Sequence, residues 1–259
     1  MNKLLTSLIF ILTISICNGQ TADEVNKKAK DFLSIGNTKN AVPLLKKAAE
    51  MGQPESQYNY GYCYQHGVEV EKNDSIANIW LLKSAKQGWL DAQFKIAYSY
   101  ATGRGVTKDE KQAFYWSVKC AEENDPECMF NVASCYQDGI GTNKNLDSML
   151  VWAIRLGSLP DLENLKLSGM VTSARANLAV KYRDGDKIKK DLLKSYMWFL
   201  IYNESKRDFS ILVQQKNIDE IKEIEKSLSQ ADKAKAKQNA EKQIGRQLKN
   251  VDNLYKQDL

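Results

Sequence analysis

The sequence predicts an all-α protein, an α-solenoid of stacked helical hairpins closed by a helical cap at its C-terminal end. Only four of the 259 residues are proline, and residues that favour helices dominate long stretches of the chain. Aromatic residues and glycines recur at a fixed interval, as they do in repeat proteins. Within each interval the apolar residues follow helical spacing. These three observations together favour a helical repeat array.

The first segment, residues 1–19, is expected to be a signal peptide. An apolar run from Leu4 to Ile16 is followed by small residues at Cys17 and Gly19, so we predict cleavage after Gly19. The run is shorter than the roughly 20 apolar residues of a spanning helix. We therefore expect export to a periplasm or the extracellular space, with no membrane span after cleavage. A lipoprotein anchor at Cys17 is the less favoured alternative, because the residue before it is bulky.

The charge pattern does not favour a nucleic-acid partner. The formal net charge is +5, and basic and acidic residues are interspersed along the chain. That arrangement is typical of a solvated helical surface rather than of a basic nucleic-acid-binding patch.

A repeat of 36 residues organises the middle of the chain. Three residue types recur at this interval: Tyr64, Tyr100 and Tyr136; Gly67, Gly103 and Gly139; and Trp80, Trp116 and Trp152. Their counterparts in a fourth repeat, Tyr182, Gly185 and Trp198, lie 46 residues after the third. This longer interval indicates a ten-residue insertion between the third and fourth repeats, near Gly157 to Met170.

An earlier, degenerate repeat precedes these, because Ala41, Ala49 and Gly52 lie 36 residues before Ala77, Ala85 and Gly88. The sequence thus predicts five repeats and a cap. After the signal peptide we expect a degenerate N-terminal helical hairpin at 20–53, repeats at 54–89 and 90–125, a repeat plus the insertion at 126–170, a degenerate repeat at 171–204, and a helical C-terminal cap or tail at 205–259.

One repeat is expected to be a pair of helices, A and B. Ala92, Ile96, Ala97 and Tyr100 form the stripe of helix A, and Ala113, Trp116, Cys120 and Ala121 that of helix B. The glycines Gly103 and Gly105 between them can take a positive φ where the chain reverses. A phosphate loop is not indicated there, because such a loop follows a strand. A single hairpin cannot hide its apolar stripe, so neighbouring hairpins must stack.

The C-terminal segment is expected to be helical. Ser229 and Asp232 form a helix-start signal. Ile244, Leu248, Val251 and Tyr255 recur at i, i+4, i+7 and i+11, which predicts a partly free last helix. Self-association through this helix, as a coiled coil, is a further hypothesis.

The repeats resemble the Sel1-like repeats, relatives of the tetratricopeptide repeats. The resemblance rests on the pattern A-x-x-x-L-G-x-x-Y-x-x-G-x-G-V-x-x-D-x-x-x-A-x-x-W, which Ala92 to Trp116 fits with Ile96 for Leu and Ala97 for Gly. It implies a right-handed solenoid that acts as a non-enzymatic scaffold and binds a protein or peptide on its concave face. In related arrays that face is lined by helix A positions turned away from helix B. The corresponding positions here are Tyr58, Tyr62, Phe94, Tyr98, Phe130 and Ser134. The alternative is that several of them only pack neighbouring A helices together.

Cys120 and Cys128 are the candidate disulfide. They flank the short reversal between one helix B and the next helix A, and cysteines eight apart at such reversals occur in exported Sel1-like proteins. Two buried free thiols are the alternative. No metal site and no cofactor are expected, because the chain lacks a C-x-x-C motif and has one histidine, His66.

No enzymatic activity is expected. The sequence contains no S-x-x-K, S-D-N or K-T-G motif and no H-E-x-x-H. A cell-wall-related or β-lactamase-like enzyme is the alternative, and it depends only on activities described for some exported relatives.

Overall fold

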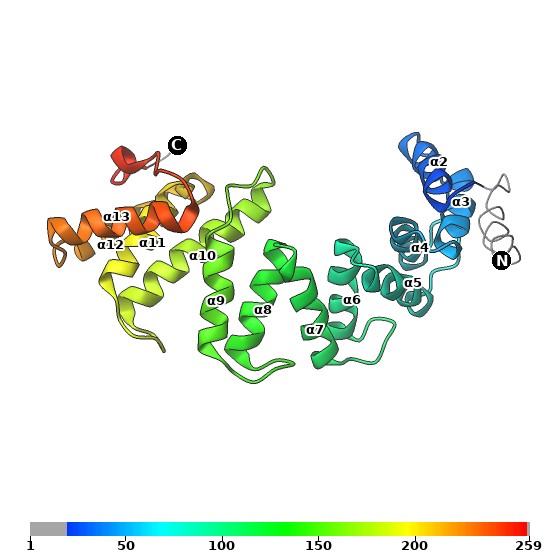
Figure 1. The fold of residues 1–259 in the computed structure, drawn as a ribbon, viewed down its shortest axis with the longest axis horizontal. Helices are drawn as coiled ribbons and strands as arrows, with labels where there is room; N and C mark the ends of the chain where they lie inside the picture. Colours follow the sequence, from blue (N-terminus) through cyan, green and yellow to red (C-terminus); the bar gives the residue numbers. More distant parts are fainter. Residues whose placement is uncertain (1–19, 258–259) are drawn as a thin grey trace, which may run out of the picture. The chain divides into compact units, whose positions relative to one another are not determined.

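The computed structural model describes residues 20–257, and within them every regular element is a helix (Figure 1). The predicted signal peptide, residues 1–19 with Cys17, lies outside the described residues. None of the described helices is both long and apolar enough to cross a membrane. The α-helices are α2 (Ala22–Ser34), α3 (Thr38–Glu50), α4 (Pro54–His66), α5 (Asp74–Lys86), α6 (Leu90–Thr102), α7 (Glu110–Glu122), α8 (Pro126–Asp138), α9 (Leu146–Gly157), α10 (Leu165–Asp184), α11 (Leu192–Asn203), α12 (Ile211–Glu225) and α13 (Gln230–Ile244), with short 3-10 helices η1 (Lys206–Asp208) and η2 (Val251–Asn253).

The chain forms two compact units. The N-terminal unit ends at Ile96 and also takes in Arg104–Val106, and the C-terminal unit contains Ala97–Gly103 and the chain from Thr107 onward. In the N-terminal unit α2 packs on α3 and α4 on α5, as two successive hairpins. Their shared core is formed by Ala29, Val42, Leu45, Ala49, Tyr60 and Cys63. The ring of Tyr60 meets those of Tyr64 and Trp80 edge-on, at centroid distances of 5.1 and 5.4 Å.

The core of the C-terminal unit lies around α11. Trp198 is 1% exposed and packs among Tyr182, Phe199 and Leu178. Gly157, at the end of α9, provides the room for this indole, because a Cβ there would lie 2.9 Å from Trp198 Cζ3. The other repeat tryptophans vary: Trp116 is buried, whereas Trp80 and Trp152 are half-buried.

The second glycine of each turn sets how closely successive hairpins approach. Gly141 has a φ of +69°, and a Cβ on it would lie 2.1 Å from the carbonyl oxygen of Glu110, at the start of α7. Gly105 stands in the same relation to Asp74, where a Cβ would lie 2.5 Å from the carbonyl oxygen. At these two junctions the position therefore requires glycine for space as well as for conformation.

Two repeats lack this glycine and keep its backbone conformation. Glu69 and Lys187 take the place with φ of +54° and +59°. The carboxylate of Glu69 accepts a 2.7 Å hydrogen bond from the hydroxyl of Thr38 in the preceding hairpin. A side-chain hydrogen bond thus links the two hairpins at this junction.

The insertion lengthens a helix A. The helices α4, α6 and α8 each have 13 residues, whereas α10 has 20. The repeat interval places the counterpart of Pro126 at Thr172, so residues 165–171 form an N-terminal extension of α10. Asn164 begins this extension, because its side chain accepts a hydrogen bond from the backbone N–H of Leu167 at 3.1 Å.

The prediction of a partly free last helix is wrong. α13 ends at Ile244, because Gly245 takes a left-handed conformation with a φ of +69°. The chain then folds back over α11, where the buried Glu204 accepts hydrogen bonds from the backbone N–H groups of Lys249 and Asn250. Leu254 is buried in the core around Trp198. The stripe Ile244, Leu248, Val251 and Tyr255 is therefore not one face of a helix, and the coiled-coil hypothesis loses its structural basis.

Candidate functional site

The six binding candidates are divided between the two units. Tyr62, Tyr98 and Phe130 are 44%, 53% and 50% exposed, whereas Tyr58, Phe94 and Ser134 are half-buried. Tyr58, Tyr62 and Phe94 belong to the N-terminal unit, and Tyr98, Phe130 and Ser134 to the C-terminal unit.

In the N-terminal unit two of these candidates make local contacts. The ring of Tyr62 stacks on His66 at a centroid distance of 3.9 Å, and His66 Nδ1 lies 3.0 Å from the carbonyl oxygen of Tyr62. Tyr58 lies beside Trp89 at 6.5 Å, and burial raises the pKa of its hydroxyl. Tyr58 thus has a packing role, while one edge of Tyr62 faces solvent.

In the C-terminal unit, Phe130 and Ser134 line an open apolar groove with a cavity volume of about 520 Å³. Three successive helices and the residue after η1 form its walls. The lining residues are Phe130, Ala133, Ser134 and Gln137 of α8; Met149, Ala153 and Leu156 of α9; Lys166, Gly169, Met170, Ser173, Ala174, Asn177, Leu178 and Lys181 of α10; and Phe209. A half-exposed aromatic side chain at the edge of such a cavity is a common anchor for a bound partner.

The insertion provides part of this groove. Lys166, Gly169 and Met170 lie in the extension of α10 that the other A helices lack. No neighbouring atom lies within 4 Å of the place where a Cβ on Gly169 would stand. The groove is therefore open above this residue.

The charges at the groove are basic. Among the described residues, Lys166 and Lys181 are the only charged ones that line it. The side chain of Lys166 is 75% exposed, and its ammonium pairs with Glu127. That of Lys181 lies 3.8 Å from Asp186. Both acidic partners stand outside the lining, so the apolar surface itself carries no negative charge.

A buried arginine fixes the insertion loop behind the groove. Arg175, on α10, is 1% exposed and donates to the carbonyl oxygens of Gly157 and Leu159 at 2.9 and 2.7 Å. It also donates to the carboxylate of Asp161 at 3.1 Å and to the hydroxyl of Ser205. These bonds join the end of α9, the loop and the chain after α11 to one side chain.

Asp161 is held in its ionised form. Burial raises the pKa of its carboxyl, but hydrogen bonds from Ser205 and Arg175 and the positive charges of Arg175 and Arg246 outweigh burial. Its pKa therefore lies below the usual value. Neither Arg175 nor Asp161 stands out in the sequence, where the only signal is that both residues lie in or next to the insertion.

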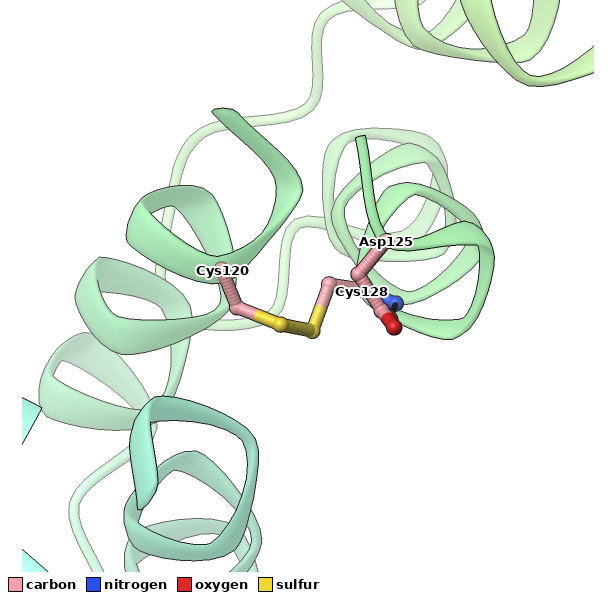
Figure 2. Close-up of side chains that lie close together, drawn as sticks. All are labelled: Cys120, Asp125 and Cys128. Carbon is pink, nitrogen blue, oxygen red and sulfur yellow. Dashed lines mark hydrogen bonds between the residues drawn. A yellow bond between two sulfur atoms is a disulfide. The ribbon is translucent and has the colours of Figure 1, made fainter. Parts of the chain in front are cut away.

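A disulfide between Cys120 and Cys128 joins the end of α7 to the start of α8, with Cα atoms 5.7 Å apart (Figure 2). The carboxylate of Asp125 lies at the same reversal and accepts a 2.8 Å hydrogen bond from the backbone N–H of Cys128. These three residues have the types and proximity of a metal-binding group among the described residues. In the bonded state, however, the sulfurs have no thiolate to offer a metal, so the arrangement acts as a covalent link at the base of the helix that carries Phe130.

The fold defines the class: an α-solenoid of helical hairpins, with a groove on its A helices. A family model described as Sel1 repeat matches residues 35–53, 54–89, 90–125, 126–148 and 172–201. These segments cover more than half of the chain, which therefore belongs to the Sel1 repeat family. The unmatched stretch between 148 and 172 contains the insertion. Proteins of this family are generally non-catalytic scaffolds for protein interactions.

One solved structure supports the fold, and a second is reported as a weaker match. The crystal structure of a Sel1 repeat protein from Oxalobacter formigenes has a TM-score of 0.62 and 25% identity, and the match covers 88% of this chain and 87% of that one. A protective antigen of uropathogenic Escherichia coli with an SLR fold matches with a TM-score of 0.41 and 20% identity, over 90% of this chain and 55% of that one. No curated protein sequence matches the chain. The predicted family and fold class are confirmed.

Proposed function

We propose that the chain is an exported, non-enzymatic scaffold that binds a protein or peptide partner on the concave face of its A helices, and that the groove beside α10 is the main binding site. The observation that carries this proposal is the open, mostly apolar groove with Phe130 half exposed at its edge. An open, mostly apolar cavity with a few polar groups in its lining is the usual form of a binding site.

The surroundings of the groove support binding rather than catalysis. Among the described residues that line it, the only ionisable ones are the two lysines, with no histidine, cysteine or carboxylate. A site for acid–base or nucleophilic chemistry usually brings several such groups together. Sel1 repeat proteins are also typically scaffolds.

A photo-crosslinking experiment tests the site. A benzophenone amino acid is placed at Asn177, which lines the groove, and separately at Asn131, which is exposed on α8 but does not line it. We expect crosslinked species in the exported fraction with the probe at Asn177 and not at Asn131. They should disappear when Gly169→Phe fills the groove. Identical species from both positions, or insensitivity to Gly169→Phe, would contradict this site.

Export itself is tested separately. N-terminal sequencing of the protein recovered from the exported fraction should begin at Gln20, the residue after the expected cleavage site. A chain that keeps Met1 and stays with the cell would contradict export without affecting the groove.

A further inference from the structure

One face of α10 runs the length of the groove. The lining residues of this helix recur at three- and four-residue spacing from Lys166 to Lys181. At 1.5 Å per residue, this stripe is about 22 Å long. The facing residues of α8, Phe130, Ala133, Ser134 and Gln137, follow the same spacing. The groove is thus bounded by two helical stripes.

Part of the α10 side of the groove is lined by residues with short side chains. Gly169, Ser173 and Asn177 follow one another at four-residue intervals. The open space above Gly169 leaves the helix backbone accessible there. Small residues at this spacing permit a second helix to approach closely, at the 8–10 Å interaxial distance typical of packed helices.

The apolar lining favours a helical occupant over an extended peptide. An extended peptide carries unpaired N–H and C=O groups and needs partners for them in the groove. Apart from the two lysines at its ends, the polar side chains along the lining are Ser134, Gln137, Ser173 and Asn177. A helix pairs its own backbone groups and presents only side chains, so it avoids the cost of burying unpaired polar groups.

The two lysines favour an occupant with a negative charge at each end. Lys166 and Lys181 stand at opposite ends of the stripe, and no acidic residue lines the groove between them. The exposed pair between Lys166 and Glu127 is of a kind worth about 0–1 kcal/mol. An incoming carboxylate can therefore compete for this ammonium at little cost.

Resting on the proposed function, we propose that the occupant of the groove is an amphipathic helix of about four turns. It has apolar residues at i, i+3/i+4 and i+7 spacing and an acidic residue near each end. Its apolar face contacts Phe130, Met170 and Leu178, and its end carboxylates pair with Lys166 and Lys181.

Three fluorescein-labelled synthetic peptides of about 16 residues test this occupant. All share one leucine stripe: the first has glutamates at both ends, the second has lysines there, and the third is the first with two central prolines. Binding to the whole mature chain is measured by fluorescence anisotropy. We expect the glutamate-ended peptide to bind at least about tenfold more tightly than either of the others. The advantage over the lysine-ended peptide should shrink at high salt.

Matched variants test whether the peptide binds in the groove. Gly169→Phe should abolish binding, while Asn131→Phe, an equally bulky change outside the groove, should leave the affinity unchanged. The double variant Lys166→Glu plus Lys181→Glu should reverse the preference toward the lysine-ended peptide. Thermal melts followed by circular dichroism establish that each variant is folded.

Several outcomes would overturn the proposal: equal or tighter binding of the lysine-ended or proline-containing peptide, binding that survives Gly169→Phe, or no binding of any of the three peptides. If crosslinks at Asn177 still depend on Gly169 while all three peptides fail, the helical occupant is refuted and the binding site stands. If the crosslinks fail as well, both proposals fall.

Discussion

Replacing Gly141 by alanine tests the idea that this glycine sets the spacing between successive hairpins. A left-handed backbone conformation costs a residue with a Cβ about 1–2 kcal/mol. At Gly141 the new Cβ would also lie 2.1 Å from the carbonyl oxygen of Glu110 and 2.9 Å from Phe114 Cβ. Relieving that overlap requires α7 and the turn to separate by more than an ångström, and forced repacking of this kind costs about 1–3 kcal/mol. We expect Gly141→Ala to destabilise the C-terminal unit by about 3 kcal/mol.

Gly245 provides a matched control. It has the same φ of +69°, and nothing lies within 4 Å of a Cβ built on it. Gly245→Ala should therefore cost only the conformational part, about 1 kcal/mol. For a unit of this size 1 kcal/mol corresponds to about 2–4 °C in Tm, so the melting temperatures should fall by roughly 6–12 °C for Gly141→Ala and 2–4 °C for Gly245→Ala. Thermal and urea unfolding followed by circular dichroism measure both. Equal losses would show that the contact with Glu110 does not limit the spacing.

Three further predictions concern the links that hold the C-terminal unit together. Closing the eight-residue separation between Cys120 and Cys128 is worth about 2.5 kcal/mol, so dithiothreitol should lower the Tm of the wild type and have no effect on the Cys120→Ser variant. The pKa of Asp161 is lowered in the folded protein, so the contribution of its carboxylate to the free energy of unfolding is fully present above the unfolded pKa of about 3.9 and is lost as the pH falls through the lower folded value. Urea titrations should therefore show the stability of Asp161→Asn decreasing less steeply below about pH 4 than that of the wild type. Removing the carboxylate with Glu204→Ala should cost about 1.5–3 kcal/mol and accelerate hydrogen exchange at the amide of Lys249, and unchanged exchange there would contradict the fold-back of the tail.

The repeat could be predicted from the sequence because its cause is local. Tyrosine, glycine and tryptophan recur in register, and each has a physical role within a hairpin or at the next junction. Glu69 departs from the glycine pattern and still adopts a φ of +54°, because the turn geometry is imposed by the helices on either side. A single departure of this kind leaves the architecture unchanged, so the pattern was sufficient for the fold class.

The C-terminal tail could not be predicted in the same way. Ile244, Leu248, Val251 and Tyr255 have helical spacing, yet Gly245 ends the helix directly after the first of them. The segment is held instead by the buried carboxylate of Glu204, more than 40 residues earlier in the chain. Spacing reports only local preference, and here a distant acceptor of backbone hydrogen bonds determined the conformation.

The candidate site was predictable only in part, because the insertion that shapes it has two separate consequences. The change of interval from 36 to 46 residues showed that extra chain was present, and the helical phase placed Phe130 and Ser134 on the face of α8 that lines the groove. The extra residues lengthen α10, which brings Lys166, Gly169 and Met170 to the groove. Arg175 then fixes the preceding loop through bonds to Gly157, Leu159 and Asp161 that no repeat pattern encodes. A regular 36-residue interval would start this helix at Thr172 and leave the groove without its first two turns. The departure from the repeat therefore provides the part of the α10 wall that extends the groove beyond a regular hairpin.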